Sequence, residues 1–164
     1  MEALNAWGGF LTAQVGASAA LAGLLFVGVS MNLKTILSAP FLPLRAFLAL
    51  ALLIGIVVIS SLLLMPGQSS VAVATETLAV GLVMWLGGSF IELRGLRAIG
   101  ESGSRTTYTA NAVLLQFATI PYLVAAALLF AGRDAGLYWL AAGVILSTIK
   151  AVVDAWVLLV EINR

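Results

Sequence analysis

The feature that most constrains this chain is the recurrence of long apolar runs along its whole length. A bilayer requires about 20 predominantly apolar residues for each helix that crosses it. The runs that meet this requirement are residues 7–31, 46–65, 71–91, 108–131 and 137–160. The sequence therefore predicts an all-α integral membrane protein, in which residues 1–164 form a single transmembrane domain built as a bundle of five transmembrane helices.

The composition excludes several other classes of protein. Hydrophobic residues make up 62% of the chain and charged residues 9%, whereas soluble domains carry about 25% charged residues. The net charge of +1 provides no basic field for nucleic acid. The chain contains neither cysteine nor histidine, which removes thiolate nucleophiles, the commonest metal ligand and the usual general base. We therefore expect no enzyme activity, no metal site and no cofactor.

The basic residues between the predicted spans indicate an orientation. Those that fall on one side of the membrane are Lys34, Arg45, Arg94, Arg97, Arg105 and Arg164. The opposite side carries Arg133, which is followed directly by Asp134. Because cytoplasmic loops carry an excess of lysine and arginine, we expect the N-terminus outside and the C-terminus in the cytoplasm.

Aromatic residues and two connections complete this map. Tryptophan and tyrosine are enriched at membrane interfaces; the expected belt residues are Trp7, Tyr138 and Trp139 on the outer side, and Tyr108 and Trp156 on the inner side. Pro40 and Pro43 should stop a continuous helix within residues 33–44, which predicts a stretch lying on the cytoplasmic leaflet. Residues 92–107 are expected to form the only sizeable soluble segment.

Three segments in the first half of the chain carry a resemblance to other proteins. They read GASAALAGLLFVGVSMNL (16–33), LPLRA (42–46) and SSLLLMPGQS (60–69). In this order they resemble a set of small bacterial polytopic membrane proteins, some of which are labelled modulators of a membrane-bound protease. The resemblance implies a multi-pass protein of the bacterial cytoplasmic (inner) membrane with a membrane-protein partner. It assigns no activity and no functional residues.

The fifth predicted span carries a lysine and, four residues later, an aspartate. At the helical period of 3.6 residues, Lys150 and Asp154 share one face. Small residues repeat along that face and should let another helix approach closely; they are Gly143, Ser147, Ala151 and Ala155. An unpaired charge at the centre of a membrane helix costs at least ~2.5–3.5 kcal/mol, and an i,i+4 partner removes part of that cost. The pair is either a structural tie within the bundle or part of an ion pathway.

Other polar residues extend this candidate site through the membrane. Gln116 on the fourth span falls near the depth of Asp154, whereas Gln14 and Glu76 fall in the outer half. Glu76 can also be interpreted as a carboxylate at the outer interface, stabilised by the start of its helix. The predicted ion pathway or polar core therefore consists of Lys150, Asp154, Gln116, Glu76 and Gln14. Nothing in the sequence shows that these faces meet.

The first span has small residues of its own, which include Gly16, Ala20 and Gly23. They predict close helix packing, either within the chain or between chains, and a homo-oligomer in the lipid bilayer. Two functions remain open. The first is a small oligomeric ion channel or transporter-like protein with a buried Lys150/Asp154 site. The alternative is a non-enzymatic accessory or regulatory subunit that binds another membrane complex through its small-residue faces.

Overall fold

The computed structural model describes residues 4, 6–38, 42–98 and 105–162 of the chain. The helices in these ranges are α2 (Gly8–Met31), α3 (Leu33–Ser38), α4 (Leu42–Leu63), α5 (Ser70–Ala98), α6 (Arg105–Phe130) and α7 (Ala135–Ile162). All of them except α3 are long and apolar enough to cross a membrane. This confirms the predicted all-helical architecture with five helices of spanning length.

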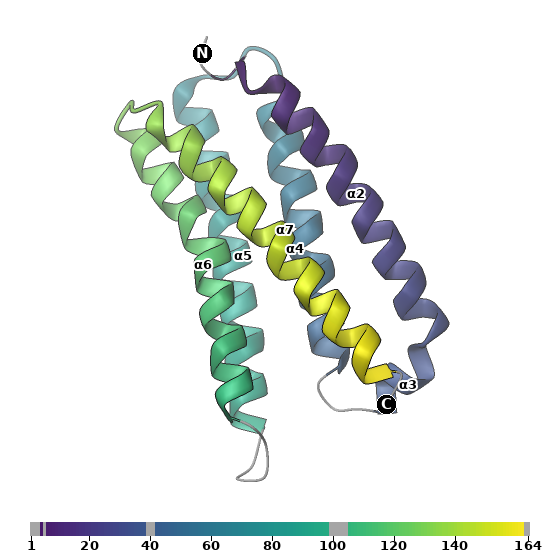
Figure 1. Cartoon of the computed structure of the whole chain (residues 1–164). Coiled ribbons are helices and arrows are strands. Elements are labelled where there is room, and N and C mark those ends of the chain that lie inside the picture. The colour runs from purple at the N-terminus through teal and green to yellow at the C-terminus, as the bar shows by residue number, and fades with distance from the viewer. Residues whose placement is uncertain (1–3, 5, 39–41, 99–104, 163–164) are drawn as a thin grey trace.

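Four of the helices close into a ring around a shared core. Helix α4 packs on α5, α5 on α6, α6 on α7, and α7 returns to α4 (Figure 1). The contacts of α6 with α5 and with α7 are the most extensive, whereas the α4–α5 contact is the smallest in the ring. Helix α2 lies outside the ring, mainly against α4, and is the least buried of the spanning helices. Successive spanning helices run in opposite directions, so α2 begins at one end of the bundle and α7 finishes at the other. We call these the N-terminal end and the C-terminal end of the bundle.

The connection before α4 is shorter than the sequence suggests. Helix α4 begins at Leu42 rather than near Ala46. Pro43 lies in its first turn, where the missing N–H would have no helical partner in any case. Consequently Arg45 belongs to the helix itself and not to the connection. Pro40, the other proline expected to stop a helix here, lies outside the described residues.

The predicted soluble segment at residues 92–107 begins too early, because the third spanning helix includes residues up to Gly95. Helix α5 continues to Ala98 and α6 begins at Arg105, so helix occupies most of this range. The side chain environment explains the difference, because Glu92 is only 7% exposed and lies inside the bundle. Its charge suggested a loop, but a hydrogen-bond partner on a neighbouring helix allows a carboxyl group to be buried.

The ring is tightly packed in its N-terminal half. Tyr122 of α6 is fully buried between Gly81 of α5 and Gly143 of α7. A Cβ added at Gly81 would lie 2.8 Å from Tyr122 Cβ, and one added at Gly143 would lie 3.0 Å from the tyrosine ring. The two glycines therefore supply the space that the tyrosine side chain fills, and the core here is solid.

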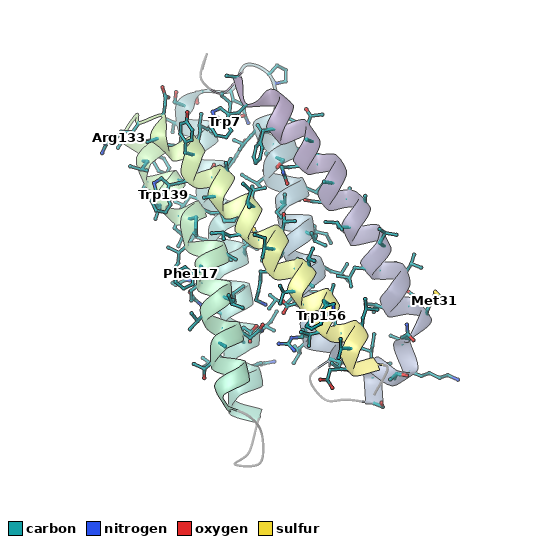
Figure 2. The ribbon with its side chains drawn as sticks, in the orientation of Figure 1. Trp7, Met31, Phe117, Arg133, Trp139 and Trp156 are labelled. Carbon is teal, nitrogen blue, oxygen red and sulfur yellow. The ribbon has the colours of Figure 1, made fainter. Side chains whose placement is uncertain are left out.

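Aromatic side chains lie toward both ends of the bundle. Trp7 packs edge-to-face on Tyr138 with ring centroids 5.0 Å apart. Figure 2 shows Trp7 and Trp139 toward the N-terminal end and Trp156 toward the C-terminal end. This distribution is consistent with the two predicted aromatic belts. The side chain of Tyr108 lies outside the described part of the chain.

Candidate functional site

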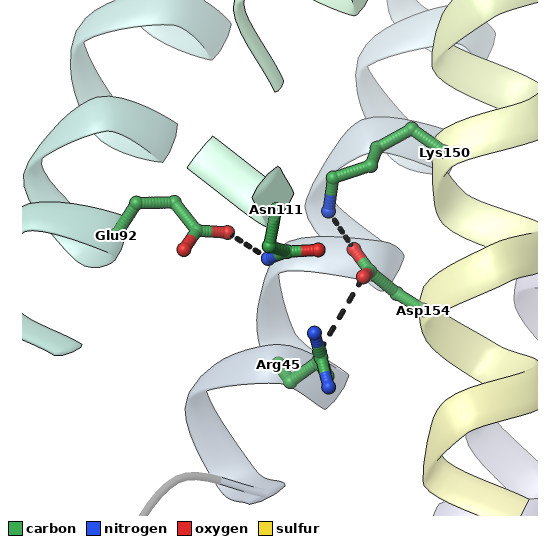
Figure 3. Close-up of polar contacts among 5 residues, drawn as sticks. All are labelled: Arg45, Glu92, Asn111, Lys150 and Asp154. Carbon is green, nitrogen blue, oxygen red and sulfur yellow. Dashed lines mark hydrogen bonds and ion pairs between the residues drawn. The ribbon is translucent and has the colours of Figure 1, made fainter. Parts of the chain in front are cut away.

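The i,i+4 pair on α7 is buried inside the bundle. Lys150 is 3% exposed and Asp154 is not exposed at all. The Lys150 ammonium donates a hydrogen bond to Asp154 Oδ2, which forms the ion pair that the helical spacing predicts. The pair faces α4, α5 and α6 rather than the outside of the bundle (Figure 3). The small-residue face of α7 therefore packs against other helices, as its spacing predicted, and its two charged side chains lie inside the bundle.

A second cation reaches Asp154 from α4. Arg45 lies in the first turns of that helix, and its Nε is 3.5 Å from Asp154 Oδ1. The Arg45 side chain is 20% exposed, so it is the most accessible charged group of the site. Asp154 thus holds one cation on each carboxylate oxygen, and the second ion pair ties α4 to α7.

A further carboxylate enters the same region from α5. Glu92 accepts a hydrogen bond at Oε1 from the side-chain amide of Asn111 on α6, and both side chains are 7% exposed. Glu92 also interacts electrostatically with Lys150, Arg45 and Asp154. The side chains of Arg45 from α4, Glu92 from α5, Asn111 from α6, and Lys150 and Asp154 from α7 converge on one region (Figure 3). We refer to Arg45, Glu92, Asn111, Lys150 and Asp154 as the charged cluster.

The charged cluster is balanced in its formal charge. It contains two basic and two acidic side chains, so its ionised form is neutral as a whole. Burying a single charge without a partner is very costly, whereas buried charges that are paired and hydrogen-bonded are tolerated. Replacing such a cluster by apolar residues is often neutral or stabilising. Ionisable residues inside a membrane bundle are therefore candidates for function rather than for stability.

The hydrogen bonds of Gln116 and Glu76, two of the other predicted pathway residues, go to partners outside the charged cluster. Gln116 accepts a hydrogen bond from Trp85 Nε1 at 2.6 Å and donates one to Ser89 Oγ at 3.1 Å. Glu76 accepts two hydrogen bonds from Gln68 Nε2, both at 2.8 Å, near the N-terminal end of the bundle. Each of these groups is satisfied locally.

Gln14, the remaining predicted pathway residue, is half-buried on α2, outside the ring. The described polar residues consequently form separate hydrogen-bonded groups.

The small-residue faces of α7 and α2 differ in their surroundings. On α7, Gly143, Ser147 and Ala151 are buried, and Ser147 Oγ donates a hydrogen bond to the Ala118 carbonyl of α6 at 3.0 Å. Ala155 is half-buried and lines an apolar groove between α2, α3 and α7.

On α2, in contrast, the small residues are exposed; these are Gly16, Ala20 and Gly23. A Cβ added at either glycine would meet nothing within 4 Å. Among the described residues, nothing packs against this face of α2.

Three members of the charged cluster were not anticipated from the sequence. Arg45 was assigned to orientation, Glu92 to a soluble segment, and Asn111 to no role. Helical projection places each of them on the same face as residues that are buried. Arg45 falls on the α4 stripe that includes buried Ala49, Leu52 and Ile56.

Glu92 and Asn111 follow the same rule. Glu92 falls on the α5 face of Gly81 and Gly88, both of which are buried, and Asn111 falls on the α6 face of Ala118 and Tyr122. A polar residue in register with a buried stripe points into the bundle.

Comparisons of the chain with models of protein families, with curated proteins and with solved structures found no match. Assignment of a function therefore depends on the chemistry of the charged cluster and on the surfaces of the bundle.

Proposed function

We propose that this protein is a transporter of a small ion and that the charged cluster is its ion-handling site. The observation that carries the proposal is the convergence of Arg45, Glu92, Lys150 and Asp154 from three helices of the ring into a buried, formally neutral group. Stability alone gives little reason to place such a group in an apolar bundle. An ion can be exchanged there at low electrostatic cost, because each charge has an alternative partner nearby.

A transport cycle fits this chain better than an open pore. Tyr122 fills the ring between Gly81 and Gly143, so the N-terminal half of the bundle has a solid core. An ion that reaches the charged cluster would therefore cross only when the helices rearrange. Within the cluster an ion pair joins α4 to α7 and a hydrogen bond joins α5 to α6, while the α4–α5 contact is the smallest in the ring. Because the extensive α5–α6 and α6–α7 contacts hold the other helices together, we infer that the ring opens at the small contact between α4 and α5.

The orientation of the bundle is part of this proposal. Lys34 on α3 and Arg94 on α5 are both exposed at the C-terminal end of the bundle. The N-terminal end carries Arg133 beside Asp134. An excess of positive charge marks the cytoplasmic side of a membrane protein. We therefore place the charged cluster toward the cytoplasmic side of a bacterial inner membrane.

Removal of the buried lysine is expected to abolish ion flux. In liposomes containing the purified protein, wild-type protein should dissipate an imposed gradient of H⁺, Na⁺, K⁺ or Cl⁻, and Lys150→Met should not, because the cluster then holds one cation for two carboxylates. Ile149→Met is the matched control, since Ile149 is the preceding residue of α7 and is 54% exposed on the outside. Equal flux through both variants, or no flux of any of these ions through wild-type protein, would contradict the proposal.

A second function is favoured by the exposed face of α2. The small residues Gly9, Ala13, Gly16, Ala20 and Gly23 are all exposed and recur at alternating steps of four and three along this helix. This spacing keeps them on one stripe, and small residues on a stripe allow another membrane helix to approach closely. We propose that α2 is the helix through which the protein, as an oligomer or as an accessory subunit, binds another transmembrane helix.

Single cysteines can test the α2 face, because the chain has no cysteine of its own. Ala20→Cys is expected to give a discrete cross-linked species when native membranes are treated with a short thiol cross-linker. Ala127→Cys, at an exposed alanine of α6, should give none. A species of twice the mass identifies a second copy, and another discrete mass identifies a different subunit. Identical patterns for the two variants would rule out a specific role for α2.

A further inference from the structure

The cations of the charged cluster are shared unequally between its two carboxylates. Asp154 has both Lys150 and Arg45 within ion-pairing distance. Glu92 has neither, and among the described residues its hydrogen-bond partner is the neutral amide of Asn111. Buried charges in proteins are normally paired directly. The arrangement in the structure is therefore the one expected of a cluster in which Asp154 is an anion and Glu92 carries a proton.

We propose that Glu92 binds and releases a proton, and that Lys150 moves from Asp154 to Glu92 when this proton leaves. The inference rests on the proposed transport function and names its ion as H⁺. In the protonated state Glu92 is neutral beside Asn111, Asp154 is held by Lys150 and Arg45, and the cluster carries one net positive charge, which the released proton removes. In the deprotonated state the proton has left to solvent, and the Glu92 carboxylate forms an ion pair with the Lys150 ammonium.

The second cation on Asp154 makes this exchange feasible. When Lys150 leaves, Arg45 remains 3.5 Å from Asp154 Oδ1, so no buried anion is left without a partner. The deprotonated state then consists of two neutral pairs, Glu92 with Lys150 and Asp154 with Arg45. A lysine is suited to move between the two carboxylates, because its ammonium is a compact charge with three donors on a flexible side chain. The movement draws α7 toward α5 and so couples proton release to the positions of the helices.

The groups that face Glu92 from the helices around it define what can influence its proton. They are Arg45 from α4, the neutral Asn111 from α6, and Lys150 with Asp154 from α7. On α5 itself, Arg94 is exposed and stacks over the Phe90 ring at 4.5 Å, outside the cluster. Arg45 is partly exposed and lies in the first turns of α4, which begins at the C-terminal end of the bundle (Figure 1), so we expect water to reach the cluster from that end.

Infrared difference spectroscopy during a pH titration detects the proton directly. A protonated carboxylic acid has a carbonyl stretching band that a carboxylate lacks. Wild-type protein should show such a band at low pH and lose it at high pH. Because the other carboxyl groups of the chain also titrate, the Glu92 band is identified by comparison: it should be present in wild-type protein and in Glu76→Gln, be absent from Glu92→Gln, and be replaced by another titrating band in Glu92→Asp. Glu76 is the matched control because it is a carboxyl group on the same helix with its own amide partner.

Proton flux into liposomes, measured with the same proteins, separates the two proposals. Glu92→Gln should abolish flux, and Glu76→Gln should retain it. A titrating Glu92 band without any flux through wild-type protein supports the proton site and overturns the transport function. Flux that survives Glu92→Gln supports transport but overturns the role of Glu92. A wild-type spectrum with no titrating band that depends on Glu92 overturns the proton site as well.

Discussion

Asp154→Ala is expected to lower the free energy of unfolding by about 3–5 kcal/mol, which is the usual effect of removing one partner of a buried ion pair. Asp154 is completely buried and is the common partner of Lys150 and Arg45. At a pH where Glu92 keeps its proton, this removal leaves the Lys150 ammonium, 3% exposed, without an ion-pair partner. The loss of this partner costs less for Arg45, because the Arg45 side chain is already 20% exposed and can turn further toward solvent.

The double variant Lys150→Met with Asp154→Leu provides the comparison that tests this explanation. It removes both charges of the α7 pair and fills their space with apolar atoms, so it should lie closer to wild-type stability than Asp154→Ala does. Asp134→Ala, at an exposed aspartate, is the control for loss of a carboxylate and should change stability by less than ~0.5 kcal/mol. Thermal melting in detergent measures all three. If the double variant melted below Asp154→Ala, the buried ion pair would not be what stabilises this region.

Gly81→Ala is expected to destabilise the bundle by about 1–3 kcal/mol, the usual cost of overpacking a filled core. The added methyl group would lie 2.8 Å from Tyr122 Cβ, and 3.6 Å from its carbonyl carbon. Neither atom can move without shifting α6, because the Tyr122 side chain is fully buried. The effect should appear as a lower melting temperature in detergent.

Gly87→Ala is the matched control for the packing effect. Gly87 is on the same helix, is exposed, and has no atom within 4 Å of an added Cβ. Alanine favours the helix by roughly 1 kcal/mol over glycine, so this substitution should be neutral or stabilising. Equal melting temperatures for Gly81→Ala and Gly87→Ala would show that the α5–α6 contact is looser than the structure indicates.

Helical projection and hydropathy predicted the features that depend on one helix at a time. The five spans follow from apolar runs of bilayer length, and their helices agree within a few residues except at 92–98 and at 42–45. The Lys150–Asp154 pair follows because both residues lie on one helix, where i,i+4 spacing fixes their distance. The small-residue face of α7 was likewise correctly predicted to face protein, as the burial of Gly143 and Ala151 confirms.

The partners of that pair from other helices depended on tertiary structure. Nothing local requires Arg45, Glu92 and Asn111 to meet α7, nor Gln116 and Glu76 to find partners elsewhere. In water, hydropathy distinguishes a buried face from an exposed one. In a membrane the lipid is as apolar as leucine, so this distinction is lost and packing detail decides which helices associate. Hydropathy and helical spacing are therefore enough to predict the helices and the contacts within each of them, whereas the packing of the helices sets which polar groups share one site.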